Sequence, residues 1–483
     1  MLVHELIKKG RSDDIAIVDD GRRITYAEAA QSIKKFRNRL YALGVRQGDR
    51  VALFSRNSAE FIYTYLATAS LGAICVPINF QLSNRETEFI LHDAETKIIL
   101  TYEPLKLEGD FFQHDLENFG ETPCEIDAPE LPADFDENSP CVIIYTSGTT
   151  GNPKGAVLSH KNLVRNTEQI DVMNCRRENK ILCILPMYHC FGWTCCVLYT
   201  FYCGAEIHVM RVFKPKDTVD IIRDEKITDI YAVPSIYRLI TMLAAPSDLK
   251  TLRLVMCSGT TLPLKIAQDF TKKFEIPISE GYGLSEASPI VTLTIPGEER
   301  EGSIGKAIPD EELKIIDDAG NILPTGDAGE LLIRGDNVML GYWKNPAATN
   351  EAIDADGWLH TGDVAKIDAD GYLYIVNRMK DMIISMGENI YPREVEEIIY
   401  RFRGIKDAAV VGVEDKLRGQ VGACFFVVQD GAQVNIHELK KFLQKNLALY
   451  KVPREFYELK DLPRTSTGKI SKRKILENFL SKY

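Results

Sequence analysis

The chain has 483 residues, of which 45% are hydrophobic and 26% are charged, and its formal net charge is −11. This length is ample for a large core and for more than one domain. The negative charge argues against nucleic acid as the main partner. The 11 cysteines lack paired Cys-x-x-Cys spacing, so we expect small buried thiols in a reducing, cytoplasmic environment and no disulfide framework or cysteine metal site.

Short apolar runs alternate with helix-like segments over the first two thirds of the chain. This alternation predicts an α/β fold, in which doubly wound parallel sheets are covered by helices. The expected strands lie at residues 50–54, 73–78, 181–185, 206–210, 229–233 and 252–257. The expected helices lie at residues 58–71, 217–224 and 263–274.

The longest apolar stretch covers residues 193–205 and contains Thr194, Thr200 and Gly204. It is shorter than the roughly 20 residues that a membrane-spanning helix needs, so it predicts a buried helix. The N-terminus lacks a basic region followed by a long apolar stretch, which predicts no signal peptide. Two alternatives stay open: a peripheral contact with a membrane to collect a lipid substrate, and the formation of a homodimer.

The pattern of expected elements changes after residue 302. Short strands at 313–316 and 329–334 alternate with turns, which predicts a small β-rich subdomain. A boundary falls near residues 378–389, and beyond it helices and strands alternate in a compact α+β pattern. We predict a large N-terminal domain at 1–379 and a small, mobile C-terminal domain at 380–483 that closes over it as a lid. Its expected elements are helices at 393–402 and 436–449, strands at 408–413 and 423–428, and a last helix after Gly468.

A segment rich in glycine and hydroxyl side chains, residues 145–155, directly follows the apolar run 142–144. A strand that opens into such a loop offers backbone N–H groups and hydroxyl donors to phosphate oxygens, and Lys154 adds a positive charge. The segment is not a Walker loop, because it lacks Gly-x-x-x-x-Gly-Lys-Ser/Thr. The predicted phosphate-binding residues are Thr146, Ser147, Gly148, Thr149, Thr150, Gly151 and Lys154.

This segment resembles the phosphate-binding signature of adenylate-forming enzymes, which include acyl-CoA synthetases, stand-alone adenylation domains and luciferases. Four further segments match in the family's order, at residues 282–286, 361–363, 378–396 and 463–469. The resemblance covers almost the whole chain and is strongest to bacterial fatty acid–CoA ligases. It implies that ATP and a carboxylic acid give acyl-AMP and pyrophosphate, and that the acyl group then passes to CoA.

The resemblance also implies roles for the residues around the nucleotide. Thr146 and Glu286 are expected to bind Mg²⁺, which prefers oxygen ligands, and Tyr282 is expected to stack on adenine. Asp363 is expected to accept both ribose hydroxyls, with Arg378 on the other side of the ribose. The remaining nucleotide-binding positions in these motifs are Gly281, Gly283 and Ser285.

Three positions of the C-terminal segments carry expectations about movement. Lys380 matches the hinge about which the lid domain rotates between the two half-reactions. Lys469 matches the lysine that contacts the carboxylate and the α-phosphate during adenylation, and it is also a candidate for regulatory acetylation. Gly387 matches the glycine that lines the pantetheine path of CoA, although Met386 stands where many relatives have a second glycine.

Residues 185–193 bear on the identity of the acid. His189 resembles the histidine near the acyl carboxylate, and Trp193 falls where long-chain fatty acyl-CoA synthetases have a gating aromatic. Gly192 replaces the aspartate that is typical of amino-acid-activating relatives. The expected acyl pocket comprises His189, Trp193, Ser258, Gly259 and Thr260.

We therefore predict a ligase for a medium- or long-chain fatty acid. The alternatives are an aryl acid–CoA ligase, an enzyme that loads an acyl or peptidyl carrier protein, and a non-catalytic nucleotide-binding protein. The last alternative predicts the loss of at least one charged motif residue, whereas this chain retains Lys154, Glu286, Asp363, Arg378 and Lys469.

Overall fold

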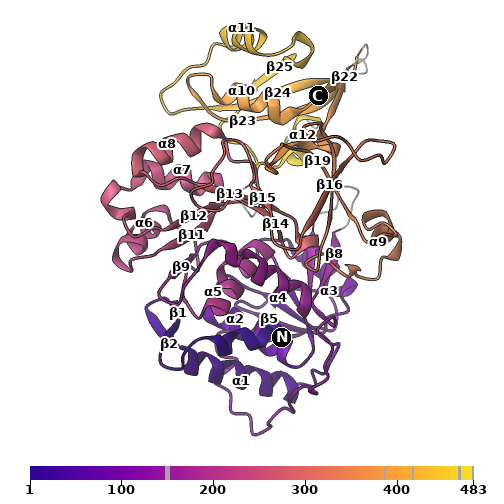
Figure 1. Cartoon of the computed structure of the whole chain (residues 1–483). Helices are drawn as coiled ribbons and strands as arrows, with labels where there is room; N and C mark the ends of the chain where they lie inside the picture. The colour runs from indigo at the N-terminus through magenta and orange to yellow at the C-terminus, as the bar shows by residue number, and fades with distance from the viewer. Residues whose placement is uncertain (147–152, 386–387, 416–417, 466–468, 481–483) are drawn as a thin grey trace.

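Figure 1 shows the computed structural model of the chain. The structure describes residues 1–146, 153–385, 388–415, 418–465 and 469–480. The described residues form two large sheets, one small antiparallel sheet and a separate C-terminal sheet. This arrangement confirms the expected mixed α/β fold.

The larger sheet has nine strands in the order β15-β14-β13-β12-β11-β9-β10-β1-β2. Its central strands pair in parallel from β1 to β13, while β2, β14 and β15 pair antiparallel at the two edges. In that order the strands are Lys306–Ala307, Ile290–Leu293, Ser279–Gly283, Leu254–Cys257, Asp229–Ala232, Lys180–Cys183, Glu206–Val209, Ile15–Asp19 and Arg22–Thr25.

The second sheet has seven strands in the order β18-β8-β7-β4-β3-β5-β6. Its strands from β7 to β6 pair in parallel, and β8 and β18 add antiparallel pairs at one edge. In that order they are Gly341–Tyr342, Lys154–Ser159, Pro140–Thr146, Ile74–Ile78, Arg50–Phe54, Ile98–Thr101 and Phe112–Asp115. The four-stranded antiparallel sheet consists of β16 (Glu312–Ile316), β17 (Gly329–Arg334), β19 (Leu359–Ile367) and β20 (Leu373–Arg378).

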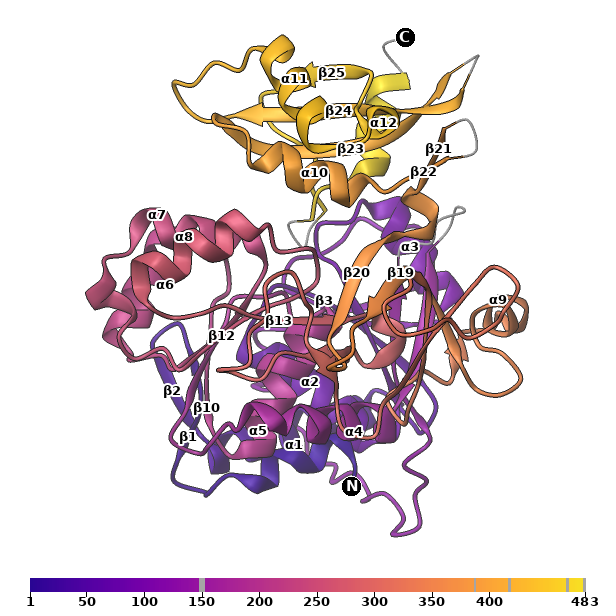
Figure 2. The same ribbon diagram turned by 45° about the horizontal axis from the view of Figure 1, so that its top comes forward.

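Helices cover the large sheets and fill the space between them. One helix, α2 (Ala59–Ser70), is buried along its whole length, as expected for a helix that is apolar on all sides. The helices α6, α7 and α8 stack side by side on one flank of the nine-stranded sheet (Figures 1 and 2). These three helices span Pro215–Asp224, Pro234–Leu243 and Leu264–Phe274. The other helices of this part of the chain are η1 (Val3–Lys9), α1 (Tyr26–Ala42), α3 (Asn84–Asp93), α4 (His160–Gln169), η2 (Ile170–Met173), α5 (Tyr199–Cys203), η4 (Pro246–Leu249), η5 (Ser285–Ala287) and α9 (Pro346–Ala352). The single turn η6 (Met379–Asp381) follows β20.

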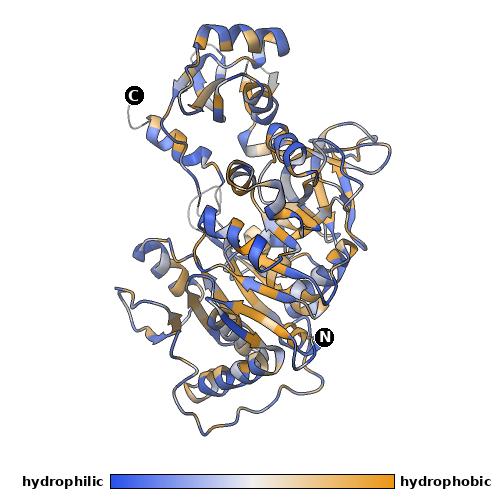
Figure 3. Cartoon of the chain, turned by 90° about the vertical axis from the view of Figure 1, so that its left-hand side faces the viewer, coloured by the Kyte–Doolittle hydropathy of each residue, from blue (hydrophilic) through white to orange (hydrophobic). Residues whose placement is uncertain are grey.

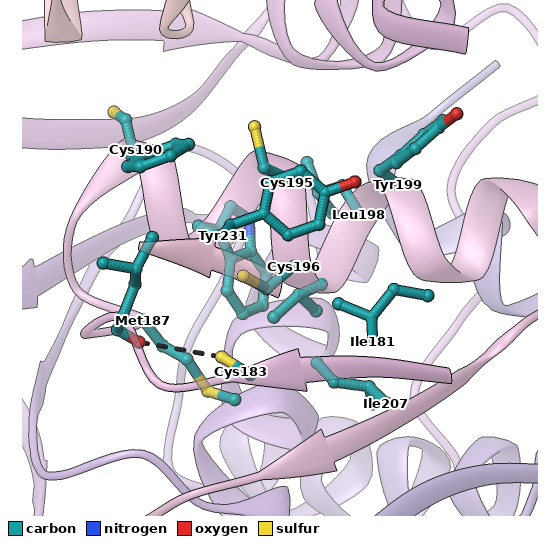
Figure 4. Packing of buried hydrophobic residues seen from close by; sticks show 14 of the residues in the cluster. Ile181, Cys183, Met187, Cys190, Cys195, Cys196, Leu198, Tyr199, Ile207 and Tyr231 are labelled. Carbon is teal, nitrogen blue, oxygen red and sulfur yellow. Dashed lines mark hydrogen bonds between the residues drawn. The ribbon is translucent and has the colours of Figure 1, made fainter. Parts of the chain in front are cut away.

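The long apolar stretch after residue 191 folds as a π-helix, η3 (Gly192–Leu198), which continues into α5. All its residues are buried, so the expectation of a buried helix is confirmed. Cys195 and Cys196 belong to the same buried cluster as Ile181, Ile207 and Tyr231 (Figure 4), and all 11 cysteines are free. Among the described residues, no helix is long and apolar enough to cross a membrane.

The C-terminal region, residues 380–483, has its own sheet and its own core. The long hairpin of β23 and β24 sends alternate side chains to two apolar clusters, with Ala408 and Val410 on one face and Ala409 and Val411 on the other, as the period of a strand requires. Figure 3 shows both hydrophobic and hydrophilic residues along the helices of this region. Its elements are β21 (Ile383–Ser385), β22 (Glu388–Ile390), α10 (Pro392–Tyr400), β23 (Ile405–Asp415), β24 (Gly419–Val428), α11 (Ile436–Asn446), η7 (Leu449–Lys451), β25 (Glu455–Glu458) and α12 (Lys472–Leu480).

Candidate active site

The residues predicted to bind the nucleotide follow the ends of strands from three sheets. Thr146 ends β7, Tyr282 lies near the end of β13, and Arg378 ends β20. Ligands of α/β proteins bind at the carboxyl ends of parallel strands, where loops from neighbouring strands converge. The fold therefore brings together motifs that lie far apart in the sequence.

Asp363 is the centre of one group of contacts. It is 2% exposed and faces Arg378 across the β19–β20 pair. Its Oδ1 lies 2.9 Å from Nε of Arg378, and its Oδ2 accepts a 2.6 Å hydrogen bond from the hydroxyl of Tyr282. The carboxylate raises the pKa of Arg378, and burial raises the pKa of Tyr282 well above its usual value. Since each carboxylate oxygen has two lone pairs, the group retains capacity to accept hydroxyl hydrogen bonds.

Glu286 is the centre of a second group. Its Oε1 accepts a 2.9 Å hydrogen bond from the hydroxyl of Tyr342 on β18. Nζ of Lys154 lies 5.2 Å from the centroid of the same tyrosine ring, and Thr146 is the direct cross-strand neighbour of Lys154. Thr146 and Glu286 present the oxygen ligands that Mg²⁺ prefers. The predicted phosphate-binding positions Ser147, Gly148, Thr149, Thr150 and Gly151 lie outside the described residues.

Tyr342 is a residue that sequence reasoning missed. It donates to the carboxylate of Glu286 and lies under the ammonium group of Lys154, so it connects the predicted Mg²⁺ ligand with the predicted phosphate-binding lysine. An isolated tyrosine between Gly341 and Trp343 has no local pattern that distinguishes it from an ordinary core aromatic. Only the pairing of β18 with β8 places it here.

His189 lies between the end of β9 and the π-helix. Burial, and then the charge of Lys469, lower its pKa to about 3, so the imidazole is neutral at physiological pH. Its Nδ1 accepts a 3.3 Å hydrogen bond from the backbone N–H of Phe191. This contact assigns the proton to Nε2 and leaves that N–H as a donor.

The histidine segment and the Tyr282 segment are held together. The hydroxyl of Thr194 donates a 2.8 Å hydrogen bond to the backbone carbonyl of Ser288. The hydroxyl of Ser285 interacts with the thiol of Cys190, whose pKa burial raises to about 12. Gly281 and Gly283 flank Tyr282 on a strand where a β-carbon would meet backbone atoms of Thr292 and Pro289. Both glycines thus permit the tight pairing of β13 with β14.

Lys469 reaches this site from the C-terminal region. Its Cε lies 3.6 Å from the position that a β-carbon on Gly259 would occupy. Burial, and then the charge of Arg378, lower the pKa of Lys469 to about 8, whereas the charge of Asp363 opposes this change. Its backbone N–H donates to the hydroxyl of Thr465 at 3.2 Å. Lys469 thus lies within electrostatic reach of Arg378, Asp363 and His189.

The predicted acyl pocket is only partly enclosed by its expected residues. Ser258 is buried, Gly259 is half-buried with φ of +84°, and Thr260 is exposed. Trp193 is 2% exposed and stacks on Tyr65 of α2 with 3.9 Å between ring centroids. The proposed gate therefore lies inside the core, against the buried helix.

The two positions linked to movement differ in what the structure shows. Lys380 lies in the single turn η6 between β20 and β21, at the junction of the two parts of the chain. Gly387 lies outside the described residues. The hinge and the pantetheine path stay predictions.

Glu206, His208 and Glu225 are the one group of described residues with metal-like spacing. Arg23 already pairs with both carboxylates, at 2.9 Å from Glu206 and 3.0 Å from Glu225. Glu206 is the first residue of β10, so this group lies at the opposite end of the sheet from the active-site motifs. We interpret it as an ion network that ties β2 to α6.

Comparisons with known proteins identify the family of the chain. The profile of the AMP-binding enzyme family matches residues 5–343, and that of the AMP-binding enzyme C-terminal domain matches residues 394–469. Feruloyl-CoA synthase from an Amycolatopsis species is 35% identical, with 96% of each chain covered. Long-chain-fatty-acid–CoA ligase from Bacillus subtilis is 33% identical, with 96% of this chain and 92% of the relative covered.

Among solved structures, ATP-bound MatB from Rhodopseudomonas palustris superimposes with a TM-score of 0.91 at 28% identity, and both chains are covered completely. The chain therefore belongs to the AMP-binding enzyme family. It is a member of the adenylate-forming superfamily, as the five motifs predict.

Proposed function

We propose that the chain is an AMP-forming acid–CoA ligase that activates a hydrophobic monocarboxylic acid. The observation that carries this proposal is the position of the Lys469 side chain beside Gly259, within electrostatic reach of His189, Asp363 and Arg378. In the first half-reaction, a carboxylate oxygen of the acid bonds to the α-phosphorus of ATP and the bond to pyrophosphate breaks. Lys469 places positive charge beside two negative groups that must approach each other, which lowers the barrier to this step.

The residues around Glu286 serve the leaving pyrophosphate. Thr146 and Glu286 are the proposed Mg²⁺ ligands, and when bound the ion neutralises phosphate charge. Tyr342 orients the carboxylate of Glu286, and Lys154 holds a further positive charge close to it. Fixed charges of this kind act without reorganisation at the moment of reaction.

The second half-reaction is proposed to use CoA. The sulfur of CoA bonds to the acyl carbonyl carbon, the bond to AMP breaks, and acyl-CoA and AMP are released. We propose that rotation about Lys380 removes Lys469 from the site before this step and that Gly387 then lines the pantetheine path. A carrier protein that presents the same pantetheine thiol is the alternative acceptor.

The first candidate for the acid is a medium- or long-chain fatty acid. The segment that follows His189 is apolar and buried, which suits a hydrocarbon chain. A β-carbon on Gly192 would lie 2.4 Å from the carbonyl oxygen of Pro186. The backbone therefore excludes an aspartate at the place where amino-acid-activating relatives carry one.

An aryl acid is the second candidate, and two observations favour it. The relative feruloyl-CoA synthase acts on an aryl acid by its name, at 35% identity over nearly the whole chain. Trp193 is enclosed between Phe61 and Tyr65, so an extended alkyl chain passes this point only after the indole moves. A compact planar acid needs no such movement.

A pyrophosphate-release assay with ATP, Mg²⁺ and CoA tests the proposal. The acids are straight-chain fatty acids of increasing length, benzoate and hydroxylated cinnamates. An optimum among the fatty acids supports the first candidate, and a preference for the aryl acids supports the second. Release that does not depend on any acid would contradict the proposed function.

A further inference from the structure

The C-terminal region is held against the large domain by contacts of two arginines. Arg238 on α7 donates a 2.6 Å hydrogen bond from Nη1 to the backbone carbonyl of Lys406 on β23. Arg393 on α10 donates from Nη1 to the backbone carbonyl of Ile375 on β20, at 2.5 Å. Figures 1 and 2 both show α10 on the side of the C-terminal region that faces the large domain. These contacts accompany the arrangement in which Lys469 reaches the active site.

A charged group spans the same interface. Glu280 on β13, two residues before Tyr282, comes from the large domain, whereas Arg393 and Glu397 lie one helical turn apart on α10. Burial raises the pKa of Glu280 to about 8, Arg393 opposes this, and Glu397 raises the pKa further. Burial also raises the pKa of Glu397, against Arg393 and Arg401. The positive charge of Arg393 thus acts on carboxylates from both sides of the interface.

Glu397 also interacts with the N-terminus of helix α8 in the large domain. The backbone N–H of Leu264, the first residue of α8, interacts with its carboxylate. The residue before it, Pro263, provides no side-chain cap for that helix. The first N–H groups of a helix need acceptors from elsewhere, and the helix dipole favours negative charge there. Glu397 supplies such a charge from across the interface.

Two other glutamates of α10 have their partners inside the C-terminal region. Glu394 lies 2.7 Å from Nζ of Lys451. Glu396 lies 2.8 Å from Nζ of Lys472 and accepts a 2.7 Å hydrogen bond from the backbone N–H of Val410. They stabilise the region itself, so Glu394 offers a matched control on the same helix.

We propose that Arg393 is a positioning residue for the first half-reaction: by donating to the carbonyl of Ile375 across the interface and offsetting the negative charges of Glu280 and Glu397, it keeps the C-terminal region in the arrangement that presents Lys469 to the acid and ATP. This inference rests on the proposed function, because it assigns Lys469 to the adenylation step. Without Arg393, the Ile375 carbonyl loses this donor and the charges of the two carboxylates are no longer offset, so their repulsion opposes this arrangement. The second half-reaction does not use Lys469, so it is insensitive to the change.

The test compares the two half-reactions in Arg393→Gln. We expect acid-dependent ATP–pyrophosphate exchange to fall at least about tenfold, since the interface loses a hydrogen bond from a charged donor and the positive charge that offsets two carboxylates. Thioester formation from synthetic acyl-adenylate and CoA is expected to stay at the wild-type rate. Arg393→Lys keeps the positive charge and is expected to retain most of the exchange. Glu394→Gln is expected to leave the ratio of the two rates unchanged.

A second-site variant separates repulsion from a general loss of structure. Glu280→Gln in the Arg393→Gln background removes one of the two facing carboxylates, so exchange is expected to recover toward the level of Glu280→Gln alone. Lowering the pH from 8.5 to 6.5 should likewise raise exchange in Arg393→Gln relative to wild type, because protonation of Glu280 or Glu397 removes the repulsion. The other charged groups that act on this cluster are Arg401, Glu396 and Asp363.

Equal loss of both half-reactions in Arg393→Gln, or no recovery in the double variant, would overturn the inference. Thermal unfolding identifies any variant that fails to fold. If Arg393→Gln fails, the rates of the two half-reactions are compared in Arg393→Lys. Wild-type protein that shows no acid-dependent exchange with any acid would instead overturn the proposed function on which the inference rests.

Discussion

Arg378 and Asp363 face each other across β19 and β20, with Nε of the arginine 2.9 Å from Oδ1 of the aspartate. The other carboxylate oxygen accepts a 2.6 Å hydrogen bond from Tyr282. One buried carboxylate therefore orients the proposed ribose site and the proposed adenine site together. This relationship makes Asp363 the most informative position at which to test nucleotide binding.

Asp363→Asn keeps the size of the side chain and removes its charge. We expect affinity for ATP to fall about tenfold or more, because Arg378 loses its partner and the amide cannot accept at both atoms. The measurement is the ATP KM of the pyrophosphate-release assay together with calorimetric titration. Asp368→Asn is the control, since Asp368 pairs with Arg300 at 2.7 Å near the turn between the same two strands. An unchanged ATP affinity in Asp363→Asn would contradict the assigned role.

Lys469 should give the first half-reaction a pH dependence. Its pKa is lowered to about 8, so the lysine is charged below pH 8 and loses its charge as the pH rises through this value. We expect exchange to decline above about pH 8, and Lys469→Arg to move that decline to higher pH, since arginine stays charged. The measurement is the pH profile of pyrophosphate exchange.

Lys469→Ala should separate the two half-reactions. We expect it to abolish pyrophosphate exchange while it spares the reaction of preformed acyl-AMP with CoA. Both rates are measured on one preparation, so a loss of folded protein would lower both together. Normal exchange in this variant would refute the assignment of Lys469.

Tyr342→Phe removes the hydroxyl that donates to Glu286 and keeps the ring beneath Lys154. We expect the Mg²⁺ concentration for half-maximal activity to rise about tenfold, as for other residues that orient a metal ligand. The measurement is a Mg²⁺ titration of the pyrophosphate-release assay. Tyr372→Phe, whose hydroxyl donates to the backbone carbonyl of Glu298, is the control. An unchanged Mg²⁺ requirement would mean that Tyr342 only fills space.

Trp193→Ala tests both the core and the proposed gate. Truncation of a buried indole stacked on Tyr65 should lower the free energy of unfolding by about 3–5 kcal/mol, because it leaves a cavity. Urea unfolding measures this loss. If the residue guards an alkyl pocket, the optimum of the fatty-acid series should shift to longer chains, whereas Trp193→Phe should keep the wild-type optimum. A lower stability with the same optimum would assign Trp193 to the core alone.

Lys380→Pro tests the proposed hinge. Proline restricts the backbone dihedral φ, so we expect thioester formation to slow more than adenylation does. Single-turnover measurements of both steps check this outcome. Equal slowing of both steps would count against a hinge at this position.

The sequence by itself determined the family and the class of fold and predicted the principal site residues, because these signals are local. The glycine-rich segment after β7 and the short motifs around Tyr282 and Asp363 each combine a strand end with a turn and a chemically distinctive side chain. The apolar runs likewise predict parallel strands by their length and spacing. Such signals need no knowledge of what lies across the molecule.

The tertiary structure alone decided which of these groups meet. The contact of Tyr342 with Glu286, the enclosure of Trp193 by α2 and the hydrogen bond from Arg393 to the carbonyl of Ile375 follow from the order of strands and the docking of the C-terminal region. Contacts of this kind form between residues distant in sequence, and no local periodicity encodes them. The lowered pKa values of His189 and Lys469 arise first from burial and then from charged neighbours that only the folded chain brings together.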